Sequence, residues 1–500
     1  MNEEEKNKII ELQTLLAQKS MFNDPVFIGL QEKQTKLRGG KSKEEYSPVW
    51  YSEVEDDKGK TKKNINLYLL EEEIFQENHF LRDNFYKSGY RYDSQLGCWG
   101  DDFQDYLGKI IIDKFKSVGY MKNSDYDLIF KMVNKDIYKK HYQRVFEKSN
   151  PYLAHFKNGT FNIETGKIQP HNPDDYILEY RDYDLDTSSD KKTPITDEWF
   201  KQSFKGEAQF IMEFIGYCFA RTYEPFQLFV ILRGSGSDGK STFLRYLAEM
   251  IGEQNSSALS LKDITGKDSR FATSQLYQKS LNYFADIGSD FVEQTEVVKS
   301  LTGGDKVKAE FKNQTPFMFK NHAKLIFSAN ELPAVKDFTD GFKRRVCLID
   351  YNFIDDFAEK FDMEEIYKEI PAFAYKCIRK FKERLDSPVI DKSCAVPVNQ
   401  LSITPKMIAD RGEWLKEANN VAQFAEECCE LSSDYHIGNL ALRNAYKRFC
   451  DDNGYKAMGK TKLNKELANL GIESNKPIRV NGKPSKGYKG IKLNSQYKPI

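Results

Sequence analysis

The sequence predicts an α/β central domain, preceded by an α+β domain and followed by a winged-helix domain. Three observations lead to this prediction. An apolar run, a glycine-rich loop and an amphipathic stretch follow one another at residues 229–250. Further apolar runs alternate with polar segments up to about residue 350, and the chain from residue 439 onward combines two helical patterns with a basic hairpin.

The glycine-rich loop at residues 234–241 has the spacing G-x-x-x-x-G-K-[ST] of a phosphate-binding loop. The apolar run at residues 229–232 suits a buried strand, and the following residues carry Phe243 and Leu247 at helical spacing. Because this motif belongs between a strand and a helix, its context favours a functional loop over a glycine-rich turn that matches by chance.

Each residue type in this loop has a role in binding a triphosphate. Gly234, Gly236 and Gly239 let backbone amides approach the phosphates, which also face the positive end of the following helix. Lys240 would bridge the β- and γ-phosphates, and the Ser241 hydroxyl would bind Mg²⁺. The sequence therefore predicts ATP and Mg²⁺ as cofactors. The predicted nucleotide-binding residues are Gly234, Ser235, Gly236, Ser237, Asp238, Gly239, Lys240, Ser241 and Thr242.

Polar residues follow two later apolar runs. Asp286 ends the strand predicted at residues 281–285, where its carboxylate is placed to bind Mg²⁺. Asn330 follows the strand predicted at residues 324–327 and would orient the attacking water against the γ-phosphate. The alternative for both residues is turn formation, a common use of Asp and Asn at strand ends.

Arg344 and Arg345 stand directly before another apolar strand. A basic pair is usually part of a solvated face. An arginine finger that reaches across a subunit boundary also needs such a position.

The composition excludes little by itself. Lys and Arg together equal Asp and Glu at 75 each, so any basic surface must be local. No run of about 18 apolar residues occurs, and the charged start MNEEEKNK lacks the apolar core of a signal peptide. We therefore expect a soluble cytoplasmic protein without a membrane partner. The eight cysteines are scattered, which favours reduced thiols over a disulfide framework; a metal site built from distant residues is the alternative.

The chain before the loop predicts several local elements. Residues 3–18 read as an amphipathic helix, and residues 31–64 as loops or an exposed hairpin. Hairpins are predicted at residues 90–99 and 154–168, and residues 187–197 read as a linker.

The C-terminal part is locally basic. Residues 411–430 read as one helix, residues 439–453 and 460–470 as two more, and residues 478–493 as a hairpin that turns at Asn481 and Gly482. Residues 453–500 hold eleven Lys and Arg against two acidic residues, a charge pattern expected of a duplex-binding helix and wing. A solubilising tail is the alternative. The candidate duplex contacts are Lys462, Lys465, Lys483, Lys486 and Lys489.

Five segments occur in a specific order: GSGSDGKST, LNYFADI, TGGDKVKAEFKNQTPFMF, AKLIFSANELP and DGFKRRVCLIDY. In this order they resemble the superfamily-three AAA+ helicases, in particular the phage and plasmid primase-helicase family that includes the poxvirus helicase-primase. The chain is also similar to the replication proteins of staphylococcal pathogenicity islands and cassette elements. The resemblance covers about residues 85–385, with a weaker match at the C-terminus.

This resemblance implies roles for particular residues. The catalytic set would be Lys240, Asp286, Asn330 as the sensor, and Arg344 or Arg345 as a finger in the neighbouring subunit. A pre-sensor hairpin would fall at residues 310–319. The residues near its tip, which would grip single-stranded DNA in the pore of a ring, are Lys312, Asn313 and Gln314. An ordinary surface hairpin with incidental lysines is the alternative.

One departure from the family pattern concerns the second acidic motif. Many relatives carry two adjacent carboxylates, whereas Ile287 follows Asp286 here. Asp290 or Asp305 could supply the other carboxylate, so the identity of the general base stays open.

We therefore expect an ATP-dependent DNA helicase, a homohexamer that initiates replication of a phage, plasmid or mobile element. The rivals are a bifunctional primase-helicase and a DNA-binding nucleotide switch that does not unwind. The expected domains are residues 1–195, the motor at 196–385, a linker and helix at 386–430, and the winged helix at 431–500.

Overall fold

A computed structural model defines the fold. It describes residues 48–83, 89–140, 142–143, 145–188, 192–266, 268–287, 295–313, 315–333, 340–387, 389–390, 397–398, 400–417, 420–453, 455, 457–480, 483–495 and 497. The chain divides into two compact units. The first runs up to Leu81 and includes Asp102–Tyr142, and the second contains Arg82–Asp101 and Gln143–Ile500.

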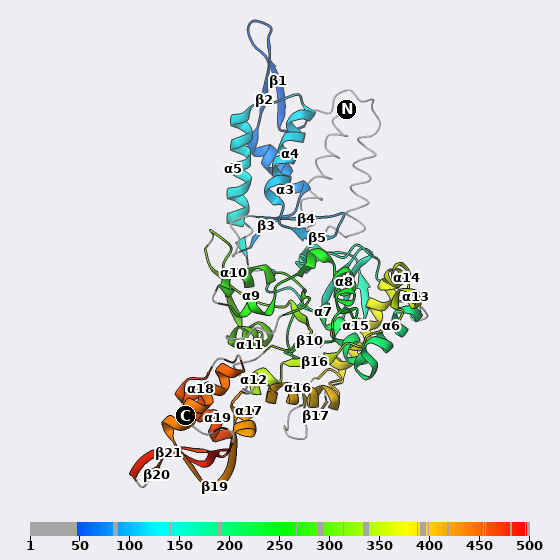
Figure 1. Ribbon diagram of the computed structural model, residues 1–500. Helices are drawn as coiled ribbons and strands as arrows, with labels where there is room; N and C mark the ends of the chain where they lie inside the picture. The colour runs from blue at the N-terminus through cyan, green and yellow to red at the C-terminus, as the bar shows by residue number, and fades with distance from the viewer. Residues whose placement is uncertain are drawn as a thin grey trace. The chain divides into compact units, whose positions relative to one another are not determined.

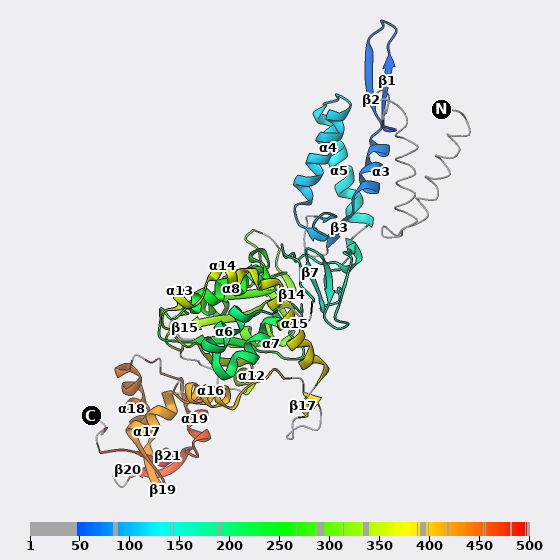
Figure 2. The ribbon, with the colours of Figure 1, turned by 90° about the vertical axis from the view of Figure 1, so that its right-hand side faces the viewer.

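Among its described residues, the first unit contains three helices and a hairpin. The helices α3 (Leu67–Glu77), α4 (Phe103–Ser117) and α5 (Asn123–Lys140) bury one apolar cluster between them. The strands β1 (Tyr51–Glu55) and β2 (Thr61–Ile65) form an antiparallel hairpin that projects beyond these helices (Figure 2). This pair is the exposed hairpin expected within residues 31–64. The helix expected at residues 3–18 lies outside the described residues.

Small antiparallel sheets precede the central domain. The strands β4 (Tyr90–Asp93) and β5 (Cys98–Gly100) pair as the sequence predicts. A three-stranded sheet then forms in the order β7-β8-β9, which confirms the hairpins expected at residues 154–168. Its strands are Leu153–Phe156, Gly159–Asn162 and Lys167–Gln169, and two further strands, β3 (Phe80–Asp83) and β6 (Tyr142–Gln143), lie at the borders of the two units.

A parallel five-stranded sheet forms the centre of the second unit. Its order is β11-β12-β15-β10-β16. The strands are β10 (Phe229–Arg233), β11 (Ser256–Ser257), β12 (Leu281–Phe284), β15 (Lys324–Ala329) and β16 (Val346–Asp350). The prediction of an α/β central domain is thereby confirmed, and the arrangement is consistent with a phosphate-binding-loop fold.

Both faces of this sheet are covered, which explains why its strands are almost continuously apolar. Along β10, Val230 and Leu232 join one buried cluster, whereas Phe229 and Ile231 join the other. Helices α6, α7, α8 and α15 cover the first face, whereas α9 and α11 cover the second and lie to the left of β10 and β16 in Figure 1. The helix bounds are α6 (Pro194–Phe204), α7 (Ala208–Cys218), α8 (Lys240–Ile251), α9 (Leu261–Thr265), α10 (Ser269–Thr273), α11 (Thr295–Gly303), α12 (Asp340–Lys343), α13 (Phe357–Lys360), α14 (Met363–Lys368), α15 (Ile370–Asp386) and α16 (Pro405–Glu417).

The strand order fixes where a ligand can bind. β10 pairs with β15 on one side and with β16 on the other, so the chain that follows it crosses to one side of β10 and returns to the other. Ligands of open parallel sheets bind at such switch points, outside the carboxyl ends of the strands. The loop at residues 234–239 leaves β10 at this point.

Two expectations need correction near the sheet. The linker expected at residues 187–197 overlaps α6, which begins at Pro194 because proline suits the first turn of a helix. The hairpin that the resemblance implies at residues 310–319 has other bounds, since it is formed by β13 (Lys306–Ala309) and β14 (Phe317–Lys320). Residues from Glu310 onward therefore lie in the connection between the strands.

The C-terminal part of the second unit has its own buried cluster. Helices α17, α18 and α19 gather beside an antiparallel sheet of order β19-β21-β20 (Figure 2). Their bounds are α17 (Asn420–Cys428), α18 (Asn439–Asp452), α19 (Lys460–Asn469), β19 (Cys429–Gly438), β20 (Glu473–Val480) and β21 (Lys483–Leu493). The short strands β17 (Val389–Ile390) and β18 (Pro397–Val398) pair before α16.

The prediction of a single helix at residues 411–430 is wrong. Instead, α16 ends at Glu417, α17 begins at Asn420, and β19 follows it directly. Strand β19 was not predicted, since its apolar and polar residues show no clear alternation and only one of its ten residues is buried. Within the described residues, the search for a helix both long and apolar enough to span a bilayer finds none.

Candidate nucleotide-binding site

The loop between β10 and α8 is shaped by glycine. Gly239 has a φ of +98°, a left-handed conformation that favours glycine. A Cβ atom on Gly234 would lie 1.9 Å from Oδ2 of Asp238 and 2.8 Å from Nζ of Lys240. Only glycine therefore lets the loop fold closely around these two charged groups.

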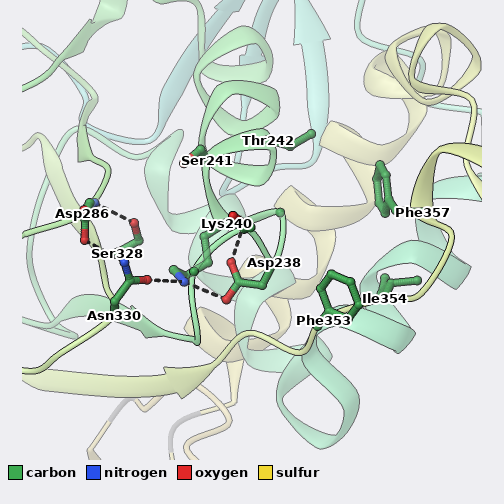
Figure 3. Close-up of a pocket in the computed structure, with 13 residues that line it drawn as sticks. Asp238, Lys240, Ser241, Thr242, Asp286, Ser328, Asn330, Phe353, Ile354 and Phe357 are labelled. Atoms are coloured by element: carbon green, nitrogen blue, oxygen red, sulfur yellow. Dashed lines mark hydrogen bonds and ion pairs between the residues drawn. The ribbon is translucent and has the colours of Figure 1, made fainter.

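A row of polar contacts joins the loop to the neighbouring strands (Figure 3). The Lys240 ammonium lies 2.7 Å from Oδ2 of Asp238 and donates a 3.1 Å hydrogen bond to Oδ1 of Asn330. The Asn330 amide in turn donates a 3.2 Å hydrogen bond to Oδ1 of Asp286. Both Asp238 and Lys240 are buried, so their charges are little screened by water.

Asp286 occupies a special backbone position after β12. Its φ is +58°, and its amide donates a 3.0 Å hydrogen bond to the Ser328 hydroxyl on β15. The next amide, of Ile287, donates a 2.8 Å hydrogen bond to the carbonyl of Ser328. These contacts hold the carboxylate of Asp286 at the edge of the sheet beside Asn330.

A cavity of about 480 Å³ lies over the loop. Loop and helix residues from Gly236 to Thr242 line it, whereas Gly234 and Ser235 do not. Figure 3 shows Asp286, Ser328 and Asn330 on one side of the loop and a second group on the other. The second group consists of Phe353, Ile354 and Phe357. The cavity therefore has a polar side and an apolar side.

The cavity offers oxygen atoms suited to Mg²⁺. The Ser241 hydroxyl and the Asp286 carboxylate both line it. Among the described residues, no group of three or more His, Cys, Asp or Glu side chains is placed to hold a metal ion. Mg²⁺ does not need such a group, because it commonly takes one or two protein oxygens and completes its shell with phosphates and water. The residues present therefore fit this ion.

Comparisons with known proteins give matches to parts of this chain. Residues 117–215 match a family described as D5 N terminal like, residues 416–489 match one described as poxvirus D5 protein-like, and residues 232–345 match a family of unknown function, DUF5906. A protein of Acanthamoeba polyphaga mimivirus that is named as a helicase is 29% identical over 212 residues. Each family match covers less than half of this chain, so parts of the chain are similar to D5-like proteins.

The similar proteins differ in how much of each chain is covered. The match to the mimivirus protein covers 40% of this chain but only 22% of the mimivirus protein. Two solved structures of the C-terminal region of NrS-1 align with TM-scores of 0.45 and 0.44 at 16% and 13% identity. They cover 89% and 85% of this chain and 100% and 99% of their own chains.

The arginine pair Arg344 and Arg345 does not line the cavity of its own chain. Arg344 and Arg345 precede the amino end of β16, whereas the phosphate-binding loop follows the carboxyl end of β10, which is parallel to β16. Arg345 is 8% exposed and donates a 2.6 Å hydrogen bond to the carbonyl of Gly341. Arg344 is exposed and donates a 3.0 Å hydrogen bond to Gln227. The two arginines therefore differ in accessibility.

The other candidate carboxylates are not in the cavity lining. Asp305 lies beside Gly303 together with Arg345, away from the loop. Asp290 falls outside the described residues. Of these three candidate carboxylates, Asp286 is the one that the described structure places beside Asn330 and Lys240.

The hairpin β13–β14 carries a row of lysines. Lys312 and Asn313 are exposed in its loop, and Gln314 is outside the described residues. Three further exposed lysines on the strands were not predicted. In KVKA, lysine alternates with apolar residues, a pattern that indicates a strand with one exposed face. These lysines are Lys306, Lys308 and Lys320.

The basic residues of the C-terminal part are also accessible. Lys465 on α19 is exposed, and the Tyr488 hydroxyl ties β21 to this helix through a 2.6 Å hydrogen bond to Asn464. The exposed lysines of β21 are Lys483, Lys486 and Lys489. Lys462 belongs to α19, but its side chain is outside the described part.

Proposed function

We propose that the protein is an ATP-dependent DNA helicase that initiates replication of a phage, plasmid or other mobile genetic element. The observation that carries this proposal is the connected row of Lys240, Asn330 and Asp286 beside a cavity at the phosphate-binding loop. A triphosphate held there would meet a cation, an amide and a carboxylate, the groups that nucleotide hydrolysis needs.

The residues of this row have separate roles in the proposal. Lys240 binds the β- and γ-phosphates, and Ser241 and Asp286 bind Mg²⁺, which neutralises the charge that develops on the phosphates. Asn330 orients the attacking water. Because Asn330 contacts both Lys240 and Asp286, it can respond to the γ-phosphate and to the metal together.

The position of the arginines supports hydrolysis between subunits. Five residues of β16 separate Arg345 from the carboxyl end of the sheet, a distance of about 16 Å at roughly 3.3 Å per residue. Neither arginine can therefore act at the loop of its own chain without a large movement. Arg344, the exposed member, is the finger that we assign to the site of the neighbouring subunit in a homohexameric ring.

DNA binding is proposed at two surfaces. Lys312 and Asn313, with the exposed lysines of β13 and β14, would follow the phosphate backbone of a single strand. The C-terminal helices and sheet would act as a winged helix, with α19 and the exposed lysines of β21 against duplex DNA. Both surfaces use lysine as a point charge, so binding there should depend steeply on salt.

Mixing two inactive variants tests the shared site. Lys240→Ala removes the phosphate contact, and Arg344→Ala removes the finger, so each protein alone should lose ATP hydrolysis. In a mixed ring, some sites combine an intact loop with an intact finger, and hydrolysis should return in part. No recovery at any mixing ratio, with both variants shown to assemble, would refute the shared site.

A further inference from the structure

The apolar side of the cavity has no role in phosphate chemistry. Its residues Phe353 and Phe357 offer no charge and no hydrogen-bonding side-chain atom. Yet both line the same cavity as Lys240 and Ser241. Phe353 is 60% exposed, so its ring is accessible to a ligand in the cavity.

The chain holds this aromatic pair in place. The amide of Tyr351 donates a 2.8 Å hydrogen bond to the carbonyl of Arg233, at the end of β10. Asn352 donates two 2.9 Å hydrogen bonds, from its backbone and its side chain, to the carbonyl of Ser203 at the end of α6. The segment that carries Phe353 is thus fixed directly to the strand that carries the phosphate-binding loop.

The two rings differ in their surroundings. Phe357 packs edge-on against Trp199 at 5.9 Å and also contacts Phe361 at 5.2 Å, so one of its sides belongs to the core. For Phe353, no aromatic partner is found within the part of the chain that the structure describes. The Phe357 ring is therefore held by its neighbours, whereas the Phe353 ring is accessible for stacking.

The order of groups across the cavity gives a direction to a bound nucleotide. Figure 3 shows Asp286 and Asn330 on one side of Lys240, and Phe353 and Phe357 on the other. If the terminal phosphate meets Asp286 and Asn330, the opposite end of the nucleotide points toward the two phenylalanines. That end is a planar, aromatic base.

We propose that Phe353 and Phe357 form the nucleobase subsite of this cavity, with Phe353 stacking on the base. This inference rests on the proposed function, since it assumes that the loop binds nucleoside phosphates. Stacking of a base on an aromatic ring contributes to affinity without a specific hydrogen bond, because every base has a π-face.

Equilibrium binding of two probes, Mg²⁺-ADP and Mg²⁺-pyrophosphate, tests the subsite without relying on turnover. Both probes contact the loop, but only ADP carries a base. Phe353→Ala should weaken ADP binding about tenfold relative to pyrophosphate binding. Phe353→Tyr keeps the ring and should retain most of the ADP affinity. Tyr68→Ala, which removes another exposed ring from α3 in the first unit, should leave the ratio of the two affinities unchanged.

The outcomes separate this inference from the proposed function. If Phe353→Ala lowers the affinities for both probes equally, or changes neither affinity, the base subsite is refuted. The proposed nucleotide site is not affected by that result. If the wild-type protein binds neither probe, the nucleotide site itself fails, and the subsite fails with it.

Discussion

The ion pair between Asp238 and Lys240 matters most at the scale of single residues. The Asp238 carboxylate lies 2.7 Å from the ammonium that a phosphate would need, and both groups are buried. A buried charge without a partner has a large unfavourable free energy. The Lys240 ammonium therefore stays paired, either with the Asp238 carboxylate or with another anion such as a phosphate. Asp238 therefore competes with the nucleotide for the same cation.

Replacing Asp238 should reveal this competition. In Asp238→Asn, the phosphate no longer displaces a charge-assisted hydrogen bond of roughly 1.5–3 kcal/mol, so the Kd of Mg²⁺-ADP should fall about tenfold. The thermal midpoint without nucleotide should also fall, since Lys240 loses its counter-ion. Calorimetry and thermal unfolding measure the two effects. Asp355→Asn, an exposed neighbour, is the control, and weaker ADP binding in Asp238→Asn would contradict the competition.

The two arginines should separate in a paired experiment. Arg344 is exposed, so Arg344→Ala should leave the thermal midpoint unchanged while kcat for ATP falls about a thousandfold, as expected for a lost finger. Arg345 is buried, and burial lowers the pKa of its guanidinium. Arg345→Ala should lower the midpoint by about 5 °C, because it removes the hydrogen bond to Gly341. Full activity in Arg344→Ala would exclude it as the finger.

The sequence predicted the site residues that a motif or a strand end marks. Lys240, Asp286 and Asn330 are marked in this way, and the structure places them in one row, while their catalytic roles stay predictions. Phe353, which we propose for the base subsite, was not among the predicted residues, since one aromatic residue after an apolar strand carries no pattern. The contact between Asp238 and Lys240 was also beyond sequence reasoning, because it depends on how the loop turns back on itself.

At the scale of elements, β15 carries an unusual residue at its start. Lys324 is fully buried, and its ammonium donates hydrogen bonds of 2.6 Å to the carbonyl of Ala220 and 2.9 Å to that of His322. It also lies 4.2 Å from the centre of the Tyr217 ring. Burial lowers the pKa of Lys324 to about 7, although the charges of Cys218 and Glu179 act in the opposite direction.

This lowered pKa gives a pH dependence of defined sign. In the unfolded chain, Lys324 stays protonated up to about pH 10.5, so between pH 7 and 10 the unfolded state binds more protons. The destabilising effect of Lys324 is therefore present below about pH 7 and fades above it. Relative to Lys324→Met, the wild-type protein should gain stability by up to about 1.4 kcal/mol per pH unit.

Unfolding midpoints of both proteins at pH 7, 8 and 9 measure this gain. Lys58→Met, at an exposed position, is the control and should show no such trend. A constant difference between wild type and Lys324→Met across this range would mean that Lys324 stays charged in the folded protein.

The β13–β14 hairpin gives a second prediction at this scale. Replacing Lys306, Lys308 and Lys320 by alanine should weaken single-stranded DNA binding and reduce its salt slope by about 2, at roughly 0.7 per lost phosphate contact. The matched control replaces three exposed lysines of the β1–β2 hairpin by alanine, namely Lys58, Lys60 and Lys62. Equal effects of the two triple variants would indicate non-specific charge attraction.

Elements were predictable where a period was clear. The strands β10, β12 and β15 and the helix α8 follow apolar runs and helical spacing, and they formed close to the expected bounds. Strand β19 was not predictable, because its polar residues pair with β21 over a long sequence separation. The hairpin expected at residues 310–319 begins earlier, at Lys306, because the sequence does not mark where its first strand ends and its turn begins.

At the scale of the whole molecule, a buried polar network joins the segment before the central domain to the parallel sheet. Glu179 is buried and contacts Arg181 at 2.7 Å, Arg221 at 3.4 Å and the Ser280 hydroxyl at 2.5 Å. Burial alone would raise the pKa of Glu179, but the two arginines hold it below its ordinary value. The segment around Glu179 is therefore an integral part of the domain that contains the parallel sheet.

The central claim is that nucleotide binding at this loop drives strand separation by the whole assembly. Strand displacement on forked DNA with ATP and Mg²⁺, comparing wild type with Lys240→Ala, tests it most directly. The account predicts that wild type separates the strands, whereas Lys240→Ala binds the fork but leaves it intact. Unwinding by Lys240→Ala, or ATP hydrolysis by wild type without strand separation across varied forks and salt concentrations, would contradict the account.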